Sequence, residues 1–441
     1  MGDRYALLGL ARPRSSWFAD VGRWTSSASL PAEFIKCVSA EELRSRAGGA
    51  RRFSAALLDG GLSSVDRDLL VGLRNAGVAP IIVAEASRAI AWTELGAVAV
   101  LPESPTRAEI LDALATHAVM VDRLQPAPLA AQAHAPWDRP GDLIAVTGTG
   151  GVGTSTTAMA AAQGLAAARR RDRGSAERVL LADLCLRAEL AMLHDARDLV
   201  PGFPEVVDLH RGQAPGPQRL RPLAFEASER AYDLLLGIRR SVDWAVLRPV
   251  AVEAAIAGLR GAWATVVADI DATFEGEAET GSTDVEDRHA MARTVALAAD
   301  LVLVVGRPGV KWLHATVRVL DDLGRLGVAP ERLQSVIVDG PRGPRQRAEI
   351  ARALADLTSP RVRGTLATPI FLPGRGIEAA VRDAAPLPTS LCAPLASAIA
   401  AGLGRGRSVD ATLPVPASLA EPVAVTPGEL GLAGDGDGMA A

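Results

Sequence analysis

Short apolar runs alternate along the chain with stretches in which apolar positions recur every three or four residues. The runs are typical of buried strands, and the longer period is typical of amphipathic helices. In residues 1–122 the runs predict strands at Tyr5–Leu10, Ala55–Leu58, Ala79–Ala84 and Ala97–Leu101. The helical pattern predicts helices at Ala40–Ala47, Val65–Ala76 and Thr106–His117. Strands separated by helices indicate an α/β domain with a parallel sheet covered on both faces.

Residues 140–403 repeat this alternation over a longer span. Strands are predicted at Leu143–Thr147, Val179–Asp183, Asp233–Leu236, Ala264–Asp269, Leu301–Val305 and Ser335–Asp339. Most are separated by helical stretches, so we expect an open, doubly wound, mostly parallel sheet. Its binding crevice should lie at the carboxyl ends of the strands.

Two further segments lack any periodic apolar pattern. Residues 123–139 are rich in Pro and Ala and are interpreted as a linker between the two α/β domains. Residues 404–441 are rich in Pro, Ala and Gly, so we expect a disordered tail. Two domains agree with the length of 441 residues.

Composition excludes several classes of protein. The cysteines Cys37, Cys185 and Cys392 form no CxxC pair, and the six histidines do not cluster, so no zinc site is predicted. A net charge of −4 does not attract nucleic acid. No apolar run reaches the roughly 18 residues that a bilayer requires, and Met1–Arg4 lacks the layout of a signal peptide. We therefore expect a cytoplasmic protein.

A glycine-rich loop follows the predicted strand Leu143–Thr147 and precedes a helix predicted over Thr156–Ala168. The loop reads Gly148-Thr149-Gly150-Gly151-Val152-Gly153-Thr154-Ser155. In this context, glycines let backbone N–H groups converge on phosphate oxygens, and a hydroxyl such as that of Ser155 binds Mg²⁺. The P-loop pattern fails at Thr154, where lysine is expected. A glycine-rich turn without a ligand is the alternative.

The loop GTGGVGTSTT resembles the variant Walker A loop of the MinD/ParA/CpaE family. The resemblance extends over most of residues 141–403 and implies ATP or ADP with Mg²⁺ as ligand. It places Thr149 and Thr154 at the two lysine positions and Thr156 near the α-phosphate. The later segments VLLADLC, TVVADI, ADLVLVV and VIVDGPR also resemble family segments, in the family's order.

Those segments assign further roles by resemblance. Asp269 matches the Walker B carboxylate on the Mg²⁺ side, and with Ser155 it forms the implied metal site. Asp183 matches the first switch aspartate and remains the one catalytic candidate. Cys185 stands at the position of the second switch aspartate, which positions water in the family.

The lost lysines predict weak or vestigial nucleotide binding. Hydrogen bonds to charged groups contribute roughly 1.5–3 kcal/mol, so losing the lysine at Thr154 would weaken phosphate binding about 10- to 150-fold. A cation on the transition state is worth about 10³–10⁵ in rate, so we expect very slow hydrolysis or none. An arginine such as Arg187 or Arg307 is a candidate replacement for the lost charge.

The first domain resembles a response-regulator receiver, with Asp59 at the phospho-acceptor position. The acidic pair after the first strand and the lysine after the fifth are both missing, so Asp59 is interpreted as a structural carboxylate. A receiver-like domain before a degenerate ATPase domain resembles the CpaE-like subgroup.

Three functions follow from these resemblances. The first is a localisation or regulatory protein for the septum or for pilus or secretion machinery, recruited to septum or pole. The second is an active ATPase that dimerises as MinD and ParA proteins do. The third is a nucleotide-free protein-binding scaffold. A homodimer and protein partners are implied. The basic run Arg169–Arg173 and the apolar helix Leu391–Leu403 are interpreted as a helix end and a packing helix, rather than as DNA or membrane contacts.

Overall fold

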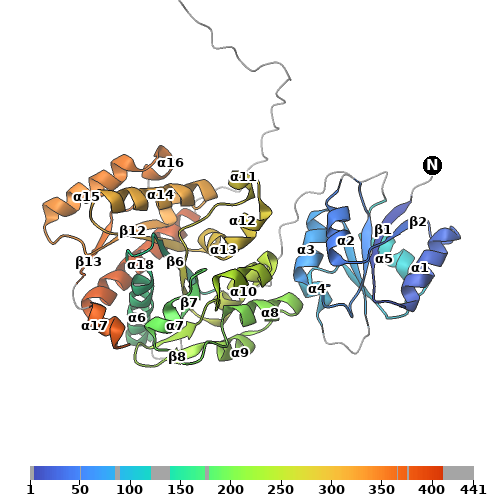
Figure 1. Cartoon of the computed structure of the whole chain (residues 1–441), viewed down its shortest axis with the longest axis horizontal. Coiled ribbons are helices and arrows are strands. Elements are labelled where there is room, and N and C mark those ends of the chain that lie inside the picture. Colours follow the sequence, from blue (N-terminus) through green and yellow to red (C-terminus); the bar gives the residue numbers. More distant parts are fainter. Residues whose placement is uncertain are drawn as a thin grey trace, which may run out of the picture.

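A computed structural model describes residues 4–49, 51–84, 90–120, 140–173, 178–364, 366–374 and 377–410. They form two α/β domains, the first at the blue end of the chain (Figure 1). The predicted linker, residues 123–139, and residues 411–441 of the predicted tail lie outside the described residues. Within the described ranges, no helix is both long and apolar enough to cross a membrane.

The first domain is built on a five-stranded parallel sheet in the order β2-β1-β3-β4-β5. Its strands are β1 (Tyr5–Leu10), β2 (Ala32–Lys36), β3 (Ala55–Asp59), β4 (Ala79–Val83) and β5 (Ala99–Leu101). Its helices are α1 (Ser16–Ser26), α2 (Ala40–Ala47), α3 (Arg67–Asn75), α4 (Trp92–Leu95) and α5 (Arg107–His117). Side chains of α1 and α5 pack on one face, and those of α2, α3 and α4 pack on the other. The predicted α/β architecture is confirmed.

The second domain contains an eight-stranded sheet in the order β13-β12-β11-β6-β10-β7-β9-β8. Among the strands that the structure describes here, only the edge strand β8 is antiparallel to its neighbour. The strands are β6 (Asp142–Gly148), β7 (Val179–Leu184), β8 (Phe225–Ala227), β9 (Tyr232–Leu235), β10 (Thr265–Ile270), β11 (Leu301–Gly306), β12 (Leu333–Val338) and β13 (Ile370–Leu372). Because β6 lies between β11 and β10, the glycine-rich loop leaves the middle of the sheet.

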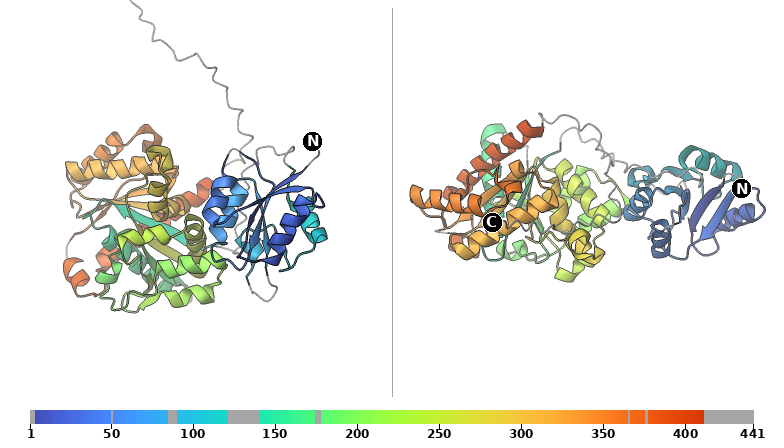
Figure 2. Two further views of the ribbon diagram at one scale, coloured as in Figure 1. Left: turned by 45° about the vertical axis from the view of Figure 1, so that its right-hand side comes forward. Right: turned by 90° about the horizontal axis from the view of Figure 1, so that it is seen from above.

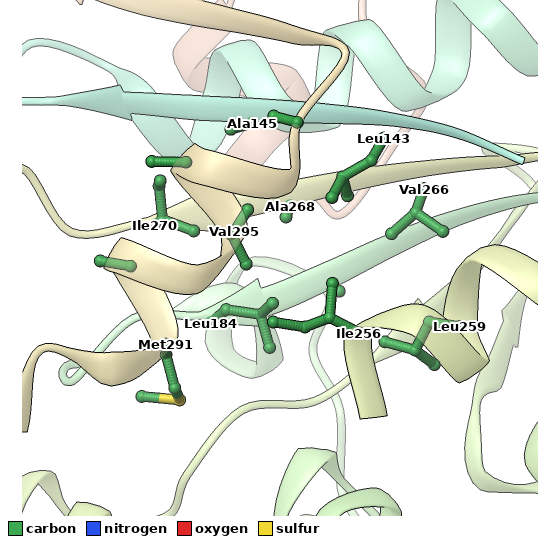
Figure 3. Close-up of a cluster of buried hydrophobic side chains, with 14 of the residues drawn as sticks. Leu143, Ala145, Leu184, Ile256, Leu259, Val266, Ala268, Ile270, Met291 and Val295 are labelled. Carbon is green, nitrogen blue, oxygen red and sulfur yellow. The ribbon is translucent and has the colours of Figure 1, made fainter. Parts of the chain in front are cut away.

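Helices cover both faces of this sheet, as a doubly wound fold requires (Figure 1). They are α6 (Thr154–Arg173), α7 (Leu190–Leu193), α8 (Phe203–Gly212), α9 (Pro217–Leu220), α10 (Pro249–Ala262), α11 (Glu277–Thr280), α12 (Thr283–Arg288), α13 (Ala290–Ala298), α14 (Val310–Leu326), α15 (Pro344–Leu357), α16 (Pro360–Arg363), α17 (Ile377–Arg382) and α18 (Thr389–Asp410). Helices α6 and α18 pack on one face. Helices α8, α10 and α13 pack on the other, and Figure 3 shows the side chains that meet there.

The boundaries differ from the sequence-based predictions at several points. The edge strand β2 and helix α1 were not predicted, and α6 begins at Thr154 rather than Thr156. Helix α18 continues to Asp410, past the boundary predicted at residue 403. Its apolar side chains, among them Leu391 and Leu395, are buried against α6 and the sheet. The interpretation of Leu391–Leu403 as a packing helix is therefore confirmed.

The two domains meet where α3 packs on α8 and α10 (Figure 2). Arg67 donates to the backbone carbonyls of His210 and Gln213 at the end of α8, at 2.8 and 3.1 Å. Asp68 accepts a hydrogen bond from the N–H of Val250, in the first turn of α10, at 2.9 Å. Because helix ends leave such groups unpaired, α3 completes the ends of two helices in the other domain.

Asp68 should make the stability of the protein depend on pH. Burial raises its pKa to about 6, and its Oδ2 has no hydrogen-bond donor among the described residues. A raised folded pKa gives stability that is lost as pH rises from the ordinary value through about 6. Asp68→Asn removes the charge and keeps an acceptor for Val250. We expect its apparent free energy of unfolding to exceed wild type by about 1–2 kcal/mol at pH 8, and by less at pH 5, in urea denaturation. An equal difference at both pH values would contradict this origin.

Candidate functional site

The glycine-rich loop joins the central strand β6 to the N-terminus of the 20-residue helix α6. Gly151 and Gly153 adopt positive φ angles of 82° and 95°, which residues with a Cβ resist. A Cβ on Gly148 would lie 2.6 Å from the carbonyl oxygen of Val305 in β11. The backbone conformation of the loop therefore requires glycine at three of its positions. The loop is partly exposed from Gly148 to Thr156, apart from the buried Val152, so an anion can approach it.

The hydroxyls at the two expected lysine positions carry no charge. Thr149 and Thr154 are both partly exposed beside the loop backbone. The chain has only two lysines, and neither belongs to the loop. Lys36 ends β2 in the first domain, where its Nζ lies 5.3 Å from the Phe18 ring centroid. Lys311 belongs to α14, and its Nζ lies 4.9 Å from the Trp312 ring centroid.

Two buried aspartates lie side by side near the carboxyl ends of β7 and β10. Asp183 in β7 and Asp269 in β10 are register partners of adjacent parallel strands, so both side chains point to the same face. They are 1% and 2% exposed. Asp183 accepts hydrogen bonds from the N–H groups of Leu190 and Cys185, at 2.9 and 3.3 Å.

Asp269 is less well satisfied than Asp183. No donor among the described residues lies within hydrogen-bond distance of its Oδ1. Burial, followed by the charge of Asp183, raises the pKa of Asp269 to about 8, although a hydrogen bond with Ser155 opposes the rise. Burial also raises the pKa of Asp183 to about 7. Ionising both carboxyls is costly because two like charges share a dry site.

A divalent cation would relieve that cost, and the donor set fits Mg²⁺. Carboxylate and hydroxyl oxygens are its preferred ligands, and it is usually held by one or two carboxylates together with substrate phosphates. The described residues contain no group of three or more His, Cys, Asp or Glu side chains able to hold a metal without other ligands. Ser155 and the unsatisfied Oδ1 of Asp269 would thus hold Mg²⁺ jointly with phosphate oxygens at the loop.

Cys185 lies beside these aspartates and cannot replace a carboxylate. Burial and then the charge of Asp269 raise the pKa of its thiol well above the ordinary value, so the thiol stays neutral at neutral pH. A neutral thiol is a weak hydrogen-bond acceptor and does not orient a water molecule for attack. The structure places Cys185 next to these aspartates, and its side chain offers no base there.

Asp59 of the first domain is held as a structural carboxylate. Its Oδ2 accepts hydrogen bonds from the backbone N–H and the Nε of Arg12, at 3.1 and 2.9 Å, and its Oδ1 accepts from Gly61 at 2.8 Å. Burial raises its pKa, but these hydrogen bonds outweigh burial and the net pKa is lowered. The side chain is 2% exposed and is paired with the Arg12 guanidinium, so both carboxylate oxygens already have partners.

Sequence reasoning missed one charged residue near the loop, Asp271. Asp271 follows β10 and accepts a hydrogen bond from the N–H of Leu186 at 2.6 Å, which fixes the segment after β7. Its position two residues after Asp269 was the available signal. Arg307, which the sequence offered as a candidate replacement for the lost charge, follows β11 and pairs with Asp339 at 3.0 Å. Its closeness to the loop depends on the order of strands in the sheet, which the sequence does not reveal.

Comparison with known proteins gives structural similarities only. No protein-family model matches the sequence, and no curated protein matches it. The ParA family ATPase of Chlorobium tepidum is 16% identical, with a TM-score of 0.41 over 62% of this chain and 99% of that one. The cell division ATPase MinD of Pyrococcus furiosus is 16% identical, with a TM-score of 0.39 over 62% of this chain and 100% of that one. An ATP complex of a Cyanothece McdA variant is 14% identical, with a TM-score of 0.42 over 60% of this chain and 97% of that one.

Proposed function

We propose that this protein binds ATP or ADP with Mg²⁺ at Gly148–Thr156 and uses the nucleotide as a regulatory ligand with very slow turnover or none. The observation that carries the proposal is the buried, unsatisfied Oδ1 of Asp269 beside its register partner Asp183. Asp269 lies near the end of β10, the neighbour of β6, and Asp183 lies near the end of β7, the next strand. A buried carboxylate without a partner costs stability. A cation held between it and a phosphate supplies the missing partner.

Each residue of the site then has a defined role. The N–H groups of the loop and of the first turn of α6 donate to phosphate oxygens, and the positive end of the helix dipole favours their charge. The Ser155 hydroxyl and the Asp269 carboxylate hold Mg²⁺, and Asp183 stays hydrogen-bonded to the segment after β7. The Thr156 hydroxyl contacts the α-phosphate.

The same site is poorly equipped for hydrolysis. Thr149 and Thr154 deliver no positive charge to the transition state, and Cys185 does not position water. Cation delivery alone is worth about 10³–10⁵ in rate. We therefore favour binding over turnover, although the intact glycines, Ser155 and Asp269 also suit the second candidate, an ATPase that cycles between monomer and dimer.

A steady-state assay separates these two functions. Phosphate release from MgATP is measured for the wild-type chain and for Ser155→Ala, which lacks the proposed Mg²⁺ ligand. We expect the two rates to agree within twofold, because what remains is background hydrolysis. A wild-type rate at least tenfold above that of Ser155→Ala would establish the active ATPase instead.

The biological role that we propose is that of a MinD/CpaE-like localisation or regulatory protein. Its support is the order of motifs in residues 141–403 behind a receiver-like domain whose Asp59 is locked by Arg12. Such a protein would act as a homodimer or with protein partners at the septum, the pole or a pilus or secretion machine. Loss of the gene should misplace septa or reduce pilus or secretion output, and a deletion strain normal in all three would contradict this role.

A further inference from the structure

Arg307 leaves the sheet directly beside the phosphate loop. Strand β11 is the hydrogen-bonded neighbour of β6, and Val305 is the register partner of Gly148, the first loop residue. Adjacent strands lie about 4.8 Å apart, and Arg307 follows two residues beyond Val305. Its backbone therefore runs alongside the start of the loop, at the same carboxyl edge of the sheet.

The present partner of Arg307 lies at the same edge. Its Nη2 is 3.0 Å from Oδ2 of Asp339, which follows β12. The next strand also reaches the loop, since the nearest atom to a Cβ built on Gly153 is a methyl carbon of Val338, at 3.9 Å. The pair of Arg307 and Asp339 thus flanks the side of the loop opposite to Asp183 and Asp269.

The ion pair between Arg307 and Asp339 is weak. The side chains of Arg307 and Asp339 are 40% and 55% exposed, and ion pairs this open to water contribute little to stability. A guanidinium forms stronger, bidentate hydrogen bonds with phosphate oxygens. A polyphosphate seated on the loop would compete with one exposed carboxylate for Arg307.

Arg187, the other candidate, lies on the wrong side. It follows β7, and β10 separates β7 from β6 in the sheet. Arg187 therefore serves the acidic side of the site, where a phosphate-bound cation would repel it.

We propose that Arg307 breaks its ion pair with Asp339 and binds the phosphate oxygens of the nucleotide. It thereby supplies, from the end of the neighbouring strand β11, the positive charge that Thr149 and Thr154 lack. The proposal rests on the proposed nucleotide-binding function. Asp339 competes with the phosphates for the guanidinium and so sets how tightly the nucleotide binds. The loop would still bind phosphate, but the positively charged side chain would come from the end of β11 instead of from the start of α6.

The test is a titration of the full-length chain with a fluorescent ATP analogue and Mg²⁺. Arg307→Ala should raise Kd about 10- to 100-fold, and Asp339→Asn should lower it severalfold. Arg187→Ala and Arg345→Ala, which remove the same charge elsewhere, should stay within threefold. Arg345 is an exposed residue of α15. An unchanged thermal midpoint for Arg307→Ala would show that the fold survives.

A double variant tests whether both positions bind the same nucleotide. Thr154→Lys should rescue most of the affinity that Arg307→Ala loses, because the two cations bind different phosphate oxygens and their effects on binding should add. A wild-type chain that binds the analogue while Arg307→Ala binds equally well would overturn the role of Arg307 and leave the nucleotide site intact. No binding by the wild-type chain would overturn both the role of Arg307 and the proposed function.

Discussion

Thr154→Lys should raise the affinity for MgATP about 10- to 150-fold. Thr154 begins α6 and is partly exposed, so a lysine there can extend along the loop. Its ammonium group would place a charged donor where the present hydroxyl offers a neutral one. Hydrolysis should remain slow in this variant, because Thr149 and Cys185 are unchanged.

Calorimetric titration with MgATP measures this effect, with Gln346→Lys as a matched control. Gln346 is exposed on α15, so this substitution adds the same charge away from the loop. The control should bind as wild type does. Equal affinity of Thr154→Lys and wild type would mean that phosphates do not reach the first turn of α6, and would favour a scaffold without nucleotide.

Asp269→Asn should make the fold more stable and should abolish the Mg²⁺ dependence of nucleotide binding. In the wild-type chain the raised folded pKa values of about 7 and 8 mean that Asp183 and Asp269 bind protons more tightly than in the unfolded chain. Stability is therefore lost as pH rises from the ordinary carboxyl range through about 8. The amide removes one of two buried like charges, and we expect a gain of about 2 kcal/mol at pH 8.5.

Urea denaturation without Mg²⁺ at pH 6 and pH 8.5 measures the gain, which should be larger at pH 8.5. Nucleotide titration of the same variant should show no difference between Mg²⁺ and EDTA. Asp284→Asn, in the exposed acidic helix α12, is the matched control and should change neither quantity. A variant less stable than wild type at both pH values would show that Asp269 is a structural carboxylate rather than a cation ligand.

Long buried strands and strong helix signals were predictable from the sequence. Strand β1 has the predicted bounds Tyr5–Leu10, and the predicted start of α5 at Thr106 is confirmed by a capping box with Glu109. The strand β2 escaped because it lies at a sheet edge, where Ala32 is the one buried residue of its five. Strands β8 and β13 each span three residues, too few for a pattern to stand out.

The site also has features that could be predicted from the sequence and features that could not. Its loop could be found from the sequence because glycine spacing encodes backbone shape, and Asp183 and Asp269 could be found as strand-end acids. That these two aspartates lie side by side depends on β10 being the neighbour of β7, which is a property of strand order. The hydrogen bond from Val250 to Asp68 spans two domains and leaves no mark in either segment.

The most direct measurement is Mg²⁺-dependent binding of a fluorescent ATP analogue to the purified full-length chain, compared with Ser155→Ala. We expect saturable binding by the wild-type chain that weakens at least tenfold in EDTA, and no such Mg²⁺ effect in Ser155→Ala, because Ser155 and Asp269 hold the cation against the phosphates. Absence of binding up to millimolar analogue, or binding that neither EDTA nor Ser155→Ala changes, would contradict a nucleotide site at Gly148–Thr156.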